Sequence, residues 1–199
     1  PGAGNAISFS SASDVLDIND RTLTIGTGSI ANTINGLGTF KGSTTSNLTL
    51  LGSGSIGLLR FTGSQDLGIF TINRQAGVVG CVIETDVTIN NSLVLINGLI
   101  DISSSSKMTL EDVATTTSAS SNSFVIADIA GSSGIFRKRF TTTYPSFVFP
   151  IGDRVASSDG AQYSPATVSF SGTTYSSTAY INVAVNDIIH PNIDSSTDY

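Results

Sequence analysis

The residues of this chain that could do chemistry are few and scattered. His190, within residues 188–192, is the only histidine, and Cys81 is the only cysteine. A serine–histidine–aspartate triad needs a positioned serine, and no Gly-x-Ser-x-Gly nucleophile elbow accompanies the histidine. One histidine and one cysteine are also too few for a zinc site. We therefore expect His190 to be a loop histidine and Cys81 to be a small buried hydrophobe without a reactive thiol.

The carboxylates offer a second kind of chemistry. Glu84 and Asp86 lie two residues apart and share one face of a straight strand, while Glu111 and Asp112 are adjacent. A glycosidase-type pair would form from Glu84 and Asp101 if these residues fell on neighbouring turns of the chain. Glu84 and Asp86, however, directly follow an apolar strand, where a corner is expected, and no aromatic platform for a sugar accompanies them. We interpret them as solvated corner charges and predict no catalytic residue.

The densest acidic group is near the N-terminus, at Asp14, Asp17 and Asp20. Closely spaced carboxylates suit calcium, but the glycine and the distal glutamate of an EF-hand loop are missing. Aspartate side chains also cap turns by bonding their own backbone. Calcium at Asp14, Asp17 and Asp20 and turn capping are thus the two alternatives here. Asp153 and Asp159 bracket a second loop of the same kind, and no other cofactor is expected.

The elements that must position these residues follow from a ladder of apolar pairs. Four pairs recur at 11-residue intervals: Leu48/Leu50, Leu59/Phe61, Phe70/Ile72 and Cys81/Ile83. Shorter steps then lead to Val87/Ile89, Leu93/Leu95, Ile100/Ile102 and Met108/Leu110. Each pair is a short strand with one buried face, and strands this short need stacked copies of themselves to bury a core. Two of the regular steps make one coil, and stacked coils predict an all-β, parallel β-helix-like solenoid.

The same alternation assigns each residue to a face of its strand. It places Ile83 inside the solenoid and Val94, between two ladder leucines, outside. The segment before the ladder is less regular, because Ile30, Ile34 and Phe40 do not fit its spacing. We expect an N-terminal cap or an irregular first coil there, since terminal repeats are commonly atypical.

The chain changes character near residue 113. Aromatic residues are sparse before this point and frequent after it, and the strands become longer, with Ala179, Ile181 and Val183 alternating with other residues. Long alternating strands separated by turns predict an antiparallel β-sandwich-like module. We therefore predict a β-helix-like domain at 1–113 and a sandwich-like module at 114–199. Its last strand leaves an edge that we expect following sequence or another protein to complete.

Composition limits the function classes. Charged residues are only 12% of the chain, about half the usual share of roughly 25%. With 39% hydrophobic residues and a mean hydropathy of +0.21, the chain is not of the disordered class. Its net charge of −6 disfavours nucleic acid as a partner. No apolar run reaches the length of about 18 residues that a membrane helix needs, so we expect no membrane span.

Several segments resemble a known family. Residues 46–50 (Ser-Asn-Leu-Thr-Leu), 67–73 (Leu-Gly-Ile-Phe-Thr-Ile-Asn) and 85–90 (Thr-Asp-Val-Thr-Ile-Asn) look like the repeats of large secreted surface proteins of gliding Bacteroidota. Residues 123–153, followed by 163–165, resemble the module that often follows those repeats. The resemblance implies an adhesin or filament-like protein that is exported by the type IX pathway to the cell surface. The C-terminal secretion-signal domain usual in such proteins is not recognisable before residue 199.

Three hypotheses on function follow. The first, which we favour, is a non-catalytic structural or adhesive segment of a larger extracellular protein. Its partners would be neighbouring domains of the same chain, other cell-surface or secretion proteins, or extracellular polysaccharide. The second is a polysaccharide-processing β-helix enzyme, which requires converging carboxylates. The third is a carbohydrate-binding module at 114–199, which requires exposed aromatics, for which Tyr144, Tyr163, Tyr175 and Tyr180 are the candidates.

Overall fold

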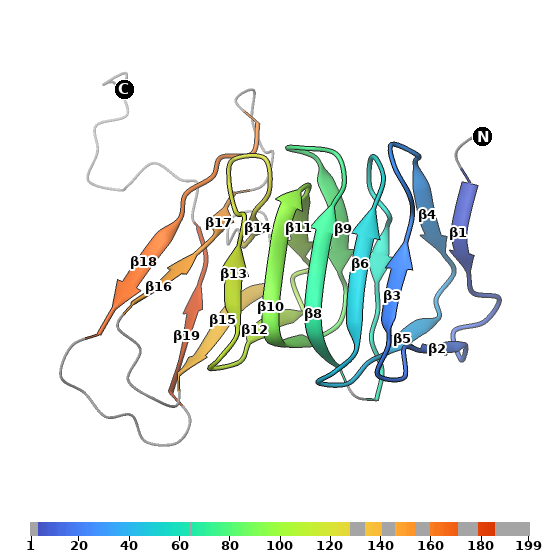
Figure 1. Cartoon of the computed structure of the whole chain (residues 1–199), viewed down its shortest axis with the longest axis horizontal. Coiled ribbons are helices and arrows are strands. Elements are labelled where there is room, and N and C mark those ends of the chain that lie inside the picture. Colours follow the sequence, from blue (N-terminus) through green and yellow to red (C-terminus); the bar gives the residue numbers. More distant parts are fainter. Residues whose placement is uncertain are drawn as a thin grey trace.

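The chain folds as a parallel β-solenoid of about six turns, followed by antiparallel strands (Figure 1). The computed structural model describes residues 4–63, 65–127, 134–140, 146–153, 160–170 and 179–185. Every regular element in these residues is a β-strand, and they contain no helix. The predicted all-β class and the solenoid are thereby confirmed.

The largest sheet forms one side of the solenoid. Its parallel strands follow in the order β3 (Thr22–Ile25), β6 (Asn47–Leu51), β8 (Asp66–Asn73), β10 (Val87–Asn97), β12 (Lys107–Leu110) and β15 (Ile135–Phe140). The first half of β10 pairs with β12 and its second half pairs with β13 (Thr115–Thr117). Two ladder pairs that the sequence separates, Val87/Ile89 and Leu93/Leu95, therefore belong to one long strand.

A second parallel sheet forms the opposite side. It contains β7 (Leu58–Leu59), β9 (Val79–Ile83), β11 (Leu99–Ile102), β14 (Val125–Ile126) and β17 (Ile151–Gly152). Two short parallel pairs complete the N-terminal end, β1 (Gly4–Ser8) with β4 (Asn32–Asn35) and β2 (Val15–Asp17) with β5 (Thr39–Lys41). Each regular step of the ladder thus crosses from one sheet to the other.

Strand register reproduces the predicted coil length where the ladder is regular. Leu48 is the register partner of Phe70, two ladder steps later, and Phe70 is in turn the partner of Leu93. All sixteen ladder residues are buried, none more than 2% exposed. Ile83 points inward and is fully buried, whereas Val94 is only half-buried on the outer face. The predicted parity is confirmed, because alternate side chains of a strand point to opposite faces.

The corners depend on glycine where coils approach closely. Gly26 follows β3 with a φ of 90°, and a Cβ there would lie 2.1 Å from the carbonyl oxygen of Leu51 in the next coil. Gly36 has a φ of 89°, and a Cβ there would lie 2.2 Å from the carbonyl oxygen of Phe9. Any other residue would be strained in backbone conformation and would push the coils apart.

The segment that departs from the ladder spacing is nevertheless part of the solenoid. Ile34 and Phe40 lie in β4 and β5 and are 8% and 0% exposed, so both belong to the core. Ile30 is partly buried beside a turn. A complete first coil of β1, β2 and β3 precedes them, with a register shift in β1 between Asn5 and Ile7. The irregular spacing therefore reflects corners of different length within the stack.

Parallel pairing continues past residue 113. β12 pairs with β15, β11 with β14 and β14 with β17, all in parallel, and one hydrophobic cluster includes Leu110, Val125 and Ile151. Among the described residues, the antiparallel strand pairs that we expected from residue 114 lie around the last coil. The division into separate domains at 1–113 and 114–199 stays a prediction, but the described residues on both sides of it share a core.

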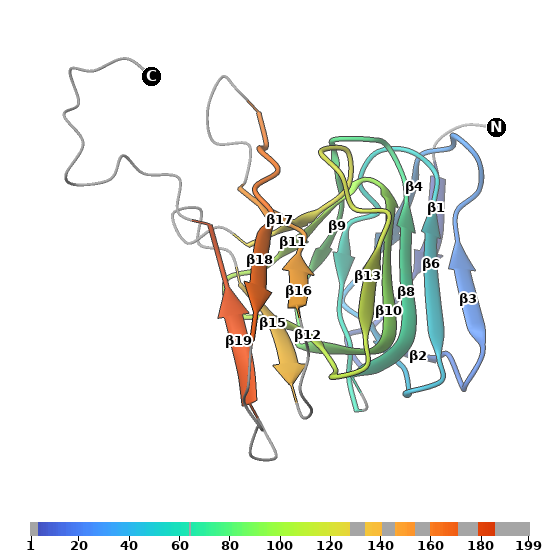
Figure 2. The ribbon, with the colours of Figure 1, turned by 60° about the vertical axis from the view of Figure 1, so that its left-hand side comes forward.

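The antiparallel strands lie at the end of the solenoid that is opposite β1 (Figure 2). β19 (Ala179–Val183) pairs with β15, and β16 (Ser146–Phe149) pairs with β18 (Ala166–Ser169). Within the described residues, β18 and β19 each pair along one edge only. What completes the predicted edge stays a prediction.

A small second cluster lies on the outer face of the second sheet. Leu99, Phe124 and Ile126 are buried there, and Tyr163 packs against them with its ring centroid 5.6 Å from that of Phe124. Asp101 is in the same outer rows and is only 2% exposed. The segment that contains Tyr163 therefore covers part of this face.

Candidate functional site

A pocket of about 430 Å³ lies at one corner of the N-terminal half of the solenoid. Its lining comes from the same corner of three successive coils, Gly28 and Ser29 from the first, Leu51–Ser53 from the second, and Asn73–Gln75 from the third. Arg74 is the only charged residue among them. Its role decides what this pocket can do.

Strand alternation directs Arg74 into the structure. Phe70 and Ile72 are fully buried on the inner face of β8, and Arg74 is the next residue of the same parity. Its side chain is 4% exposed, although the strand ends one residue earlier, at Asn73. A cation is therefore placed at the edge of an apolar core, where it needs partners for its donors.

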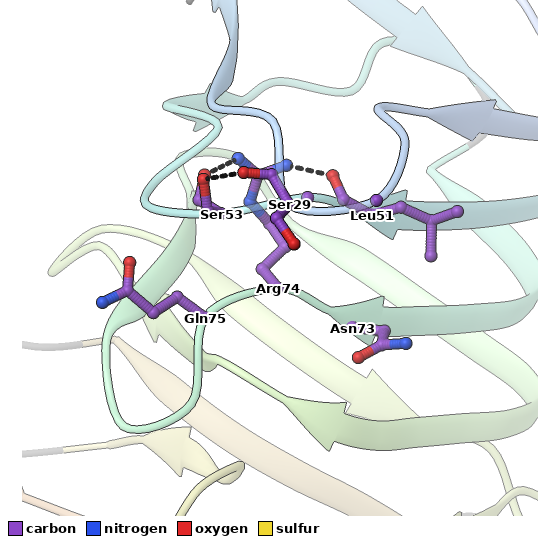
Figure 3. Close-up of a pocket in the computed structure, with 8 residues that line it drawn as sticks. Ser29, Leu51, Ser53, Asn73, Arg74 and Gln75 are labelled. Atoms are coloured by element: carbon purple, nitrogen blue, oxygen red, sulfur yellow. Dashed lines mark hydrogen bonds between the residues drawn. The ribbon is translucent and has the colours of Figure 1, made fainter.

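The guanidinium of Arg74 finds these partners in the backbone of the preceding coil (Figure 3). Nε donates to the carbonyl oxygen of Gly54 at 2.8 Å, and Nη1 donates to that of Leu51 at 2.5 Å. Nη2 donates to the carbonyl oxygens of Ser53 and, at 3.2 Å, of Asn32. Asn32 begins β4 and Leu51 ends β6, so one side chain joins both the start and the end of the second coil to the third.

These contacts determine the chemistry of the pocket. Burial lowers the pKa of Arg74 from its ordinary value, yet a guanidinium stays charged at all ordinary pH values. Four of its five N–H groups donate to carbonyl oxygens, which leaves little capacity to bind an anion. The lining contains no carboxylate, histidine or cysteine that could act as base or nucleophile. The pocket is therefore a corner stabilised by Arg74.

Lys138 is a second buried cation of the same kind. It lies between Phe136 and Phe140 on the inner face of β15 and is fully buried. Its Nζ donates to the carbonyl oxygens of Glu111, of Asp112 at 2.6 Å and of Ala114 at 3.0 Å. Burial lowers the pKa of Lys138 from 10.5 to about 8. The ammonium group ties the last parallel coil to the corner before β13.

Sequence reasoning missed both buried cations, although a signal for each was present. Arg74 continues the inward series of Phe70 and Ile72, and Lys138 lies between two inward phenylalanines. Extending the alternation to charged residues would have placed both side chains inside. A pattern that counts apolar residues alone does not include Arg74 or Lys138.

Ion pairs also connect successive coils. Asp17 pairs with Lys41 at 2.8 Å and Asp86 with Lys107 at 3.2 Å, and two further pairs join Arg60 to Glu84 and Glu111 to Arg139. The partners are 21 to 28 residues apart in sequence, which is about one coil. Glu84 and Asp86, which we interpreted from the sequence as solvated corner charges, are thus partly exposed, and each forms an ion pair with a residue of an adjacent coil.

The structure does not bring Glu84 and Asp101 into a common open site. Glu84 is bound by Arg60, and Asp101 is almost completely buried in the outer rows of the second sheet. A pair of glycosidase carboxylates must both reach a sugar chain. The burial of Asp101 prevents this in the arrangement described here.

Asp14 caps its own turn. Its carboxylate accepts hydrogen bonds from the backbone N–H groups of Ser10 at 2.7 Å and Ser11 at 2.9 Å. These bonds lower the pKa of Asp14 below its ordinary value of 3.8. Its oxygens therefore serve the turn, as one of the two alternatives predicted.

Asp17 and Asp20 accept hydrogen bonds from residues of the second coil. Asp17 accepts a hydrogen bond from Lys41, and Asp20 accepts one from Thr45 Oγ1 at 2.7 Å. Hydrogen bonds lower the pKa of both carboxyl groups. In the described residues, no three histidine, cysteine or acidic side chains form a group that could hold a metal ion. The calcium hypothesis for Asp14, Asp17 and Asp20 thus gains no support from their positions.

The remaining residues singled out from the sequence lie in different environments. Cys81 is a free, fully buried thiol, whose pKa burial raises, as expected for a small core hydrophobe. Asp153 accepts a hydrogen bond from the backbone N–H of Gln162 at 2.6 Å. Tyr163 is packed in the second cluster, and Tyr180 is 54% exposed under the Arg137 guanidinium. Four candidates lie outside the described residues: Tyr144, Asp159, Tyr175 and His190.

A shallow polar groove of about 560 Å³ crosses the coils on another corner. It is lined by hydroxyls, amides and carboxylates and one exposed valine: Thr44, Thr45, Asn90, Asn91, Glu111, Asp112 and Val113. Gly68 permits the close approach beneath it, since a Cβ there would lie 2.8 Å from the Thr44 carbonyl oxygen. No aromatic residue is in this lining, so a sugar would find hydrogen bonds but no stacking surface.

Comparison with known proteins gave no relative. No family model matches the chain, and neither a curated protein nor a solved structure matches it. The part of the chain that the structure describes contains no helix with the length and apolarity needed to cross a membrane.

Proposed function

We propose that this chain is a non-catalytic structural or adhesive segment of a large secreted cell-surface protein. The observation that carries the proposal is the use of its charged side chains. Arg74 and Lys138 bind backbone carbonyls of preceding coils, and four ion pairs join one coil to the next. A solenoid is held together only by contacts between neighbouring repeats, so these bonds strengthen the contacts on which it depends.

This distribution of charge argues against catalysis by the same residues. A general acid or base must be free to exchange a proton with a substrate, and a nucleophile must reach it. Glu84 is instead ion-paired, Asp101 is buried, and Cys81 lies in the core. The proposal therefore assigns these residues to the stack.

The location and partners rest on the resemblance of the repeats to surface proteins of gliding Bacteroidota. We propose an extracellular, cell-surface location, reached by type IX secretion. The partners would be neighbouring domains of the same chain, other cell-surface or secretion proteins, or extracellular polysaccharide. The polar groove at Thr44 and Asn91 favours polysaccharide binding as the second candidate function, because its hydroxyl and amide groups can hydrogen-bond a sugar.

A turnover assay tests whether the chain is non-catalytic. The purified chain is incubated with a panel of acidic and neutral polysaccharides, and new reducing ends and unsaturated products are measured. We expect neither to form above the level of a heat-treated control. Turnover that is abolished by Glu84→Gln would overturn the proposal in favour of a polysaccharide-processing enzyme.

The cell-surface location needs its own test. An antibody raised against the purified chain is applied to intact and to permeabilised cells of the source organism. We expect equal labelling of both. Labelling that appears only after permeabilisation would contradict the proposed location, whatever the result of the turnover assay.

A further inference from the structure

Two arginines and a tyrosine lie together on the outer face of the last parallel coil. Arg137 and Arg139 belong to β15, and Tyr180 belongs to β19, which lies beside β15 (Figure 1). Phe136 and Lys138 are buried on the inner face of β15, so strand alternation directs both arginines outward. Tyr180 is the register partner of Arg139, and directly opposed residues are neighbours on one face of a sheet. The three side chains therefore form one surface cluster.

Arg137 is held in position and keeps donors that no described residue uses. Its Nε donates to Oδ1 of Asn182 at 2.8 Å, and its guanidinium carbon lies 4.1 Å from the ring centroid of Tyr180. Within the residues that the structure describes, Arg137 forms no ion pair and its Nη groups make no hydrogen bond. Two contacts thus fix a guanidinium whose Nη hydrogens are available to a ligand.

Arg139 connects this cluster to the polar groove described above. Its Nη1 lies 3.0 Å and 3.1 Å from the two carboxylate oxygens of Glu111, and its side chain is 43% exposed. Glu111 in turn lines the groove, together with hydroxyl and amide groups of other coils. The groove, Glu111, Arg139 and Tyr180 therefore form a continuous polar strip across the coils.

Tyr180 supplies the aromatic surface that the groove lining lacks. The residue is 54% exposed, whereas every other aromatic residue in the described ranges is buried or partly buried. Tyrosine combines an apolar ring with a polar hydroxyl, which suits a sugar because a sugar ring also has an apolar face and polar edges. An apolar contact and two cations are thus present at one position.

Charge complementarity decides which class of sugar fits this position. The chain carries a net charge of −6, yet Arg137 has no acidic partner among the described residues. A guanidinium matches the two oxygens of a carboxylate or sulfate with paired N–H groups, so it recognises an acidic sugar better than a neutral one. Glu111 and Asp112 in the adjoining groove repel further anions. This excludes a chain with a charge on every unit, such as a nucleic acid.

We propose that Arg137, Arg139 and Tyr180 bind an acidic sugar in a polysaccharide whose neighbouring sugars are neutral. The carboxylate or sulfate accepts hydrogen bonds from the Nη groups of Arg137, and the sugar ring packs against Tyr180. The neutral sugars continue over Arg139 to the groove and bond to its hydroxyl and amide groups. This inference rests on the adhesive role proposed above and names the class of polysaccharide that the segment contacts.

Isothermal titration calorimetry on the full 199-residue chain tests the proposal. One probe is a hyaluronan hexasaccharide, which has a carboxylate on alternate sugars. The second is a κ-carrageenan hexasaccharide, which has a sulfate on alternate sugars, and the third is neutral maltohexaose. We expect one of the two acidic probes to bind, which identifies the anionic group, and maltohexaose to bind at least about tenfold more weakly.

Two variants and a control locate the site. Arg137→Gln and Tyr180→Val should each raise the dissociation constant of the acidic probe about tenfold, because they remove the charged donors and the ring. Arg21→Gln is the matched control, since it removes the same charge from an exposed position near the other end of the solenoid, and it should leave the dissociation constant nearly unchanged. Circular dichroism checks that each variant is folded.

Each outcome decides the proposal. Weaker binding in both variants with an unchanged control supports it. Failure of both acidic probes to bind overturns it, and so does an equal loss in Arg21→Gln, because net charge alone would then explain the binding. Preference for a single-stranded oligonucleotide over both acidic probes also overturns it. Failure of the wider proposed function is a separate result, which shows as polysaccharide turnover or as labelling of permeabilised cells alone.

Discussion

Replacing Ile83 by aspartate should unfold the coils around β9. Ile83 is fully buried, and its burial contributes about 1.5–3 kcal/mol of transfer free energy. An aspartate there would have to be protonated, which at pH 7 costs about 4 kcal/mol from an ordinary pKa near 3.9. Burying the neutral carboxyl group without partners costs about 1–3 kcal/mol more. The total of about 7–10 kcal/mol approaches the whole stability of a typical domain, about 5–15 kcal/mol.

Val94→Asp is the control, since it introduces the same side chain on β10, the next strand along the chain, in the other sheet. Val94 is half-buried on the outer face, with Thr71 and Thr117 as its register partners. Its aspartate stays solvated, so we expect a loss of about 1 kcal/mol or less. The two variants therefore compare an inward with an outward position of the solenoid.

Urea and thermal unfolding, followed by far-ultraviolet circular dichroism, measure the stability of both variants. We expect Ile83→Asp to melt far below wild type, or to be unfolded, and to recover part of its loss near pH 4, because a raised carboxyl pKa stabilises the folded state as pH falls. Coils on both sides of β9 should lose order together. Equal, large losses in the two variants would refute the one-sided burial of these strands.

Three further predictions concern the buried polar groups. Arg74→Met should lower the free energy of unfolding by about 2–4 kcal/mol, because it leaves several carbonyl oxygens without donors. The control Arg21→Met, at an exposed position, should cost about 0.5 kcal/mol or less. Urea titrations measure both losses, and equal losses would contradict the bridging role of Arg74. Burial lowers the pKa of Lys138 from 10.5 to about 8, so between these values the unfolded chain binds more protons. The free energy of unfolding of the wild type should therefore rise relative to that of Lys138→Met from pH 8 to pH 10.5. Urea melts measure both free energies, and a difference that stays constant over this range would refute the prediction. Cys81 should react with a thiol reagent only after denaturant is added, because burial raises the pKa of the thiol and keeps the reagent from reaching it. Rapid reaction of the native protein would show that the core opens.

Much of the solenoid was predictable because its signal is local. Alternation within a strand decides which face each side chain takes, and it placed Ile83 and Val94 correctly. The regular ladder step gave the coil length where corners are uniform, as between Leu48 and Phe70. It failed where corners differ, since the coil from Ile83 to its partner Ile102 is shorter and the coil from Met108 to Phe136 is longer.

The buried cations were within reach of the same reasoning. Arg74 and Lys138 occupy inward positions by parity, and the only further step was to accept a charge there. Their partners were not predictable, because backbone carbonyls of Leu51 or Ala114 leave no trace in the residue types at those positions. The same holds for the burial of Asp101, which depends on a cluster that includes Tyr163 from a later segment.

The sequence by itself determined the strand faces, the all-β class and the stacking of coils, because period-two alternation is a property of neighbouring residues. Only the tertiary structure decided which coils are adjacent at residue 113 and which charges meet, such as Glu84 with Arg60 of the preceding coil. Those outcomes depend on register between residues about one coil apart. Corner conformations set that register, and a corner of different length changes the sequence separation of the partners in its coil, as between Ile83/Ile102 and Met108/Phe136.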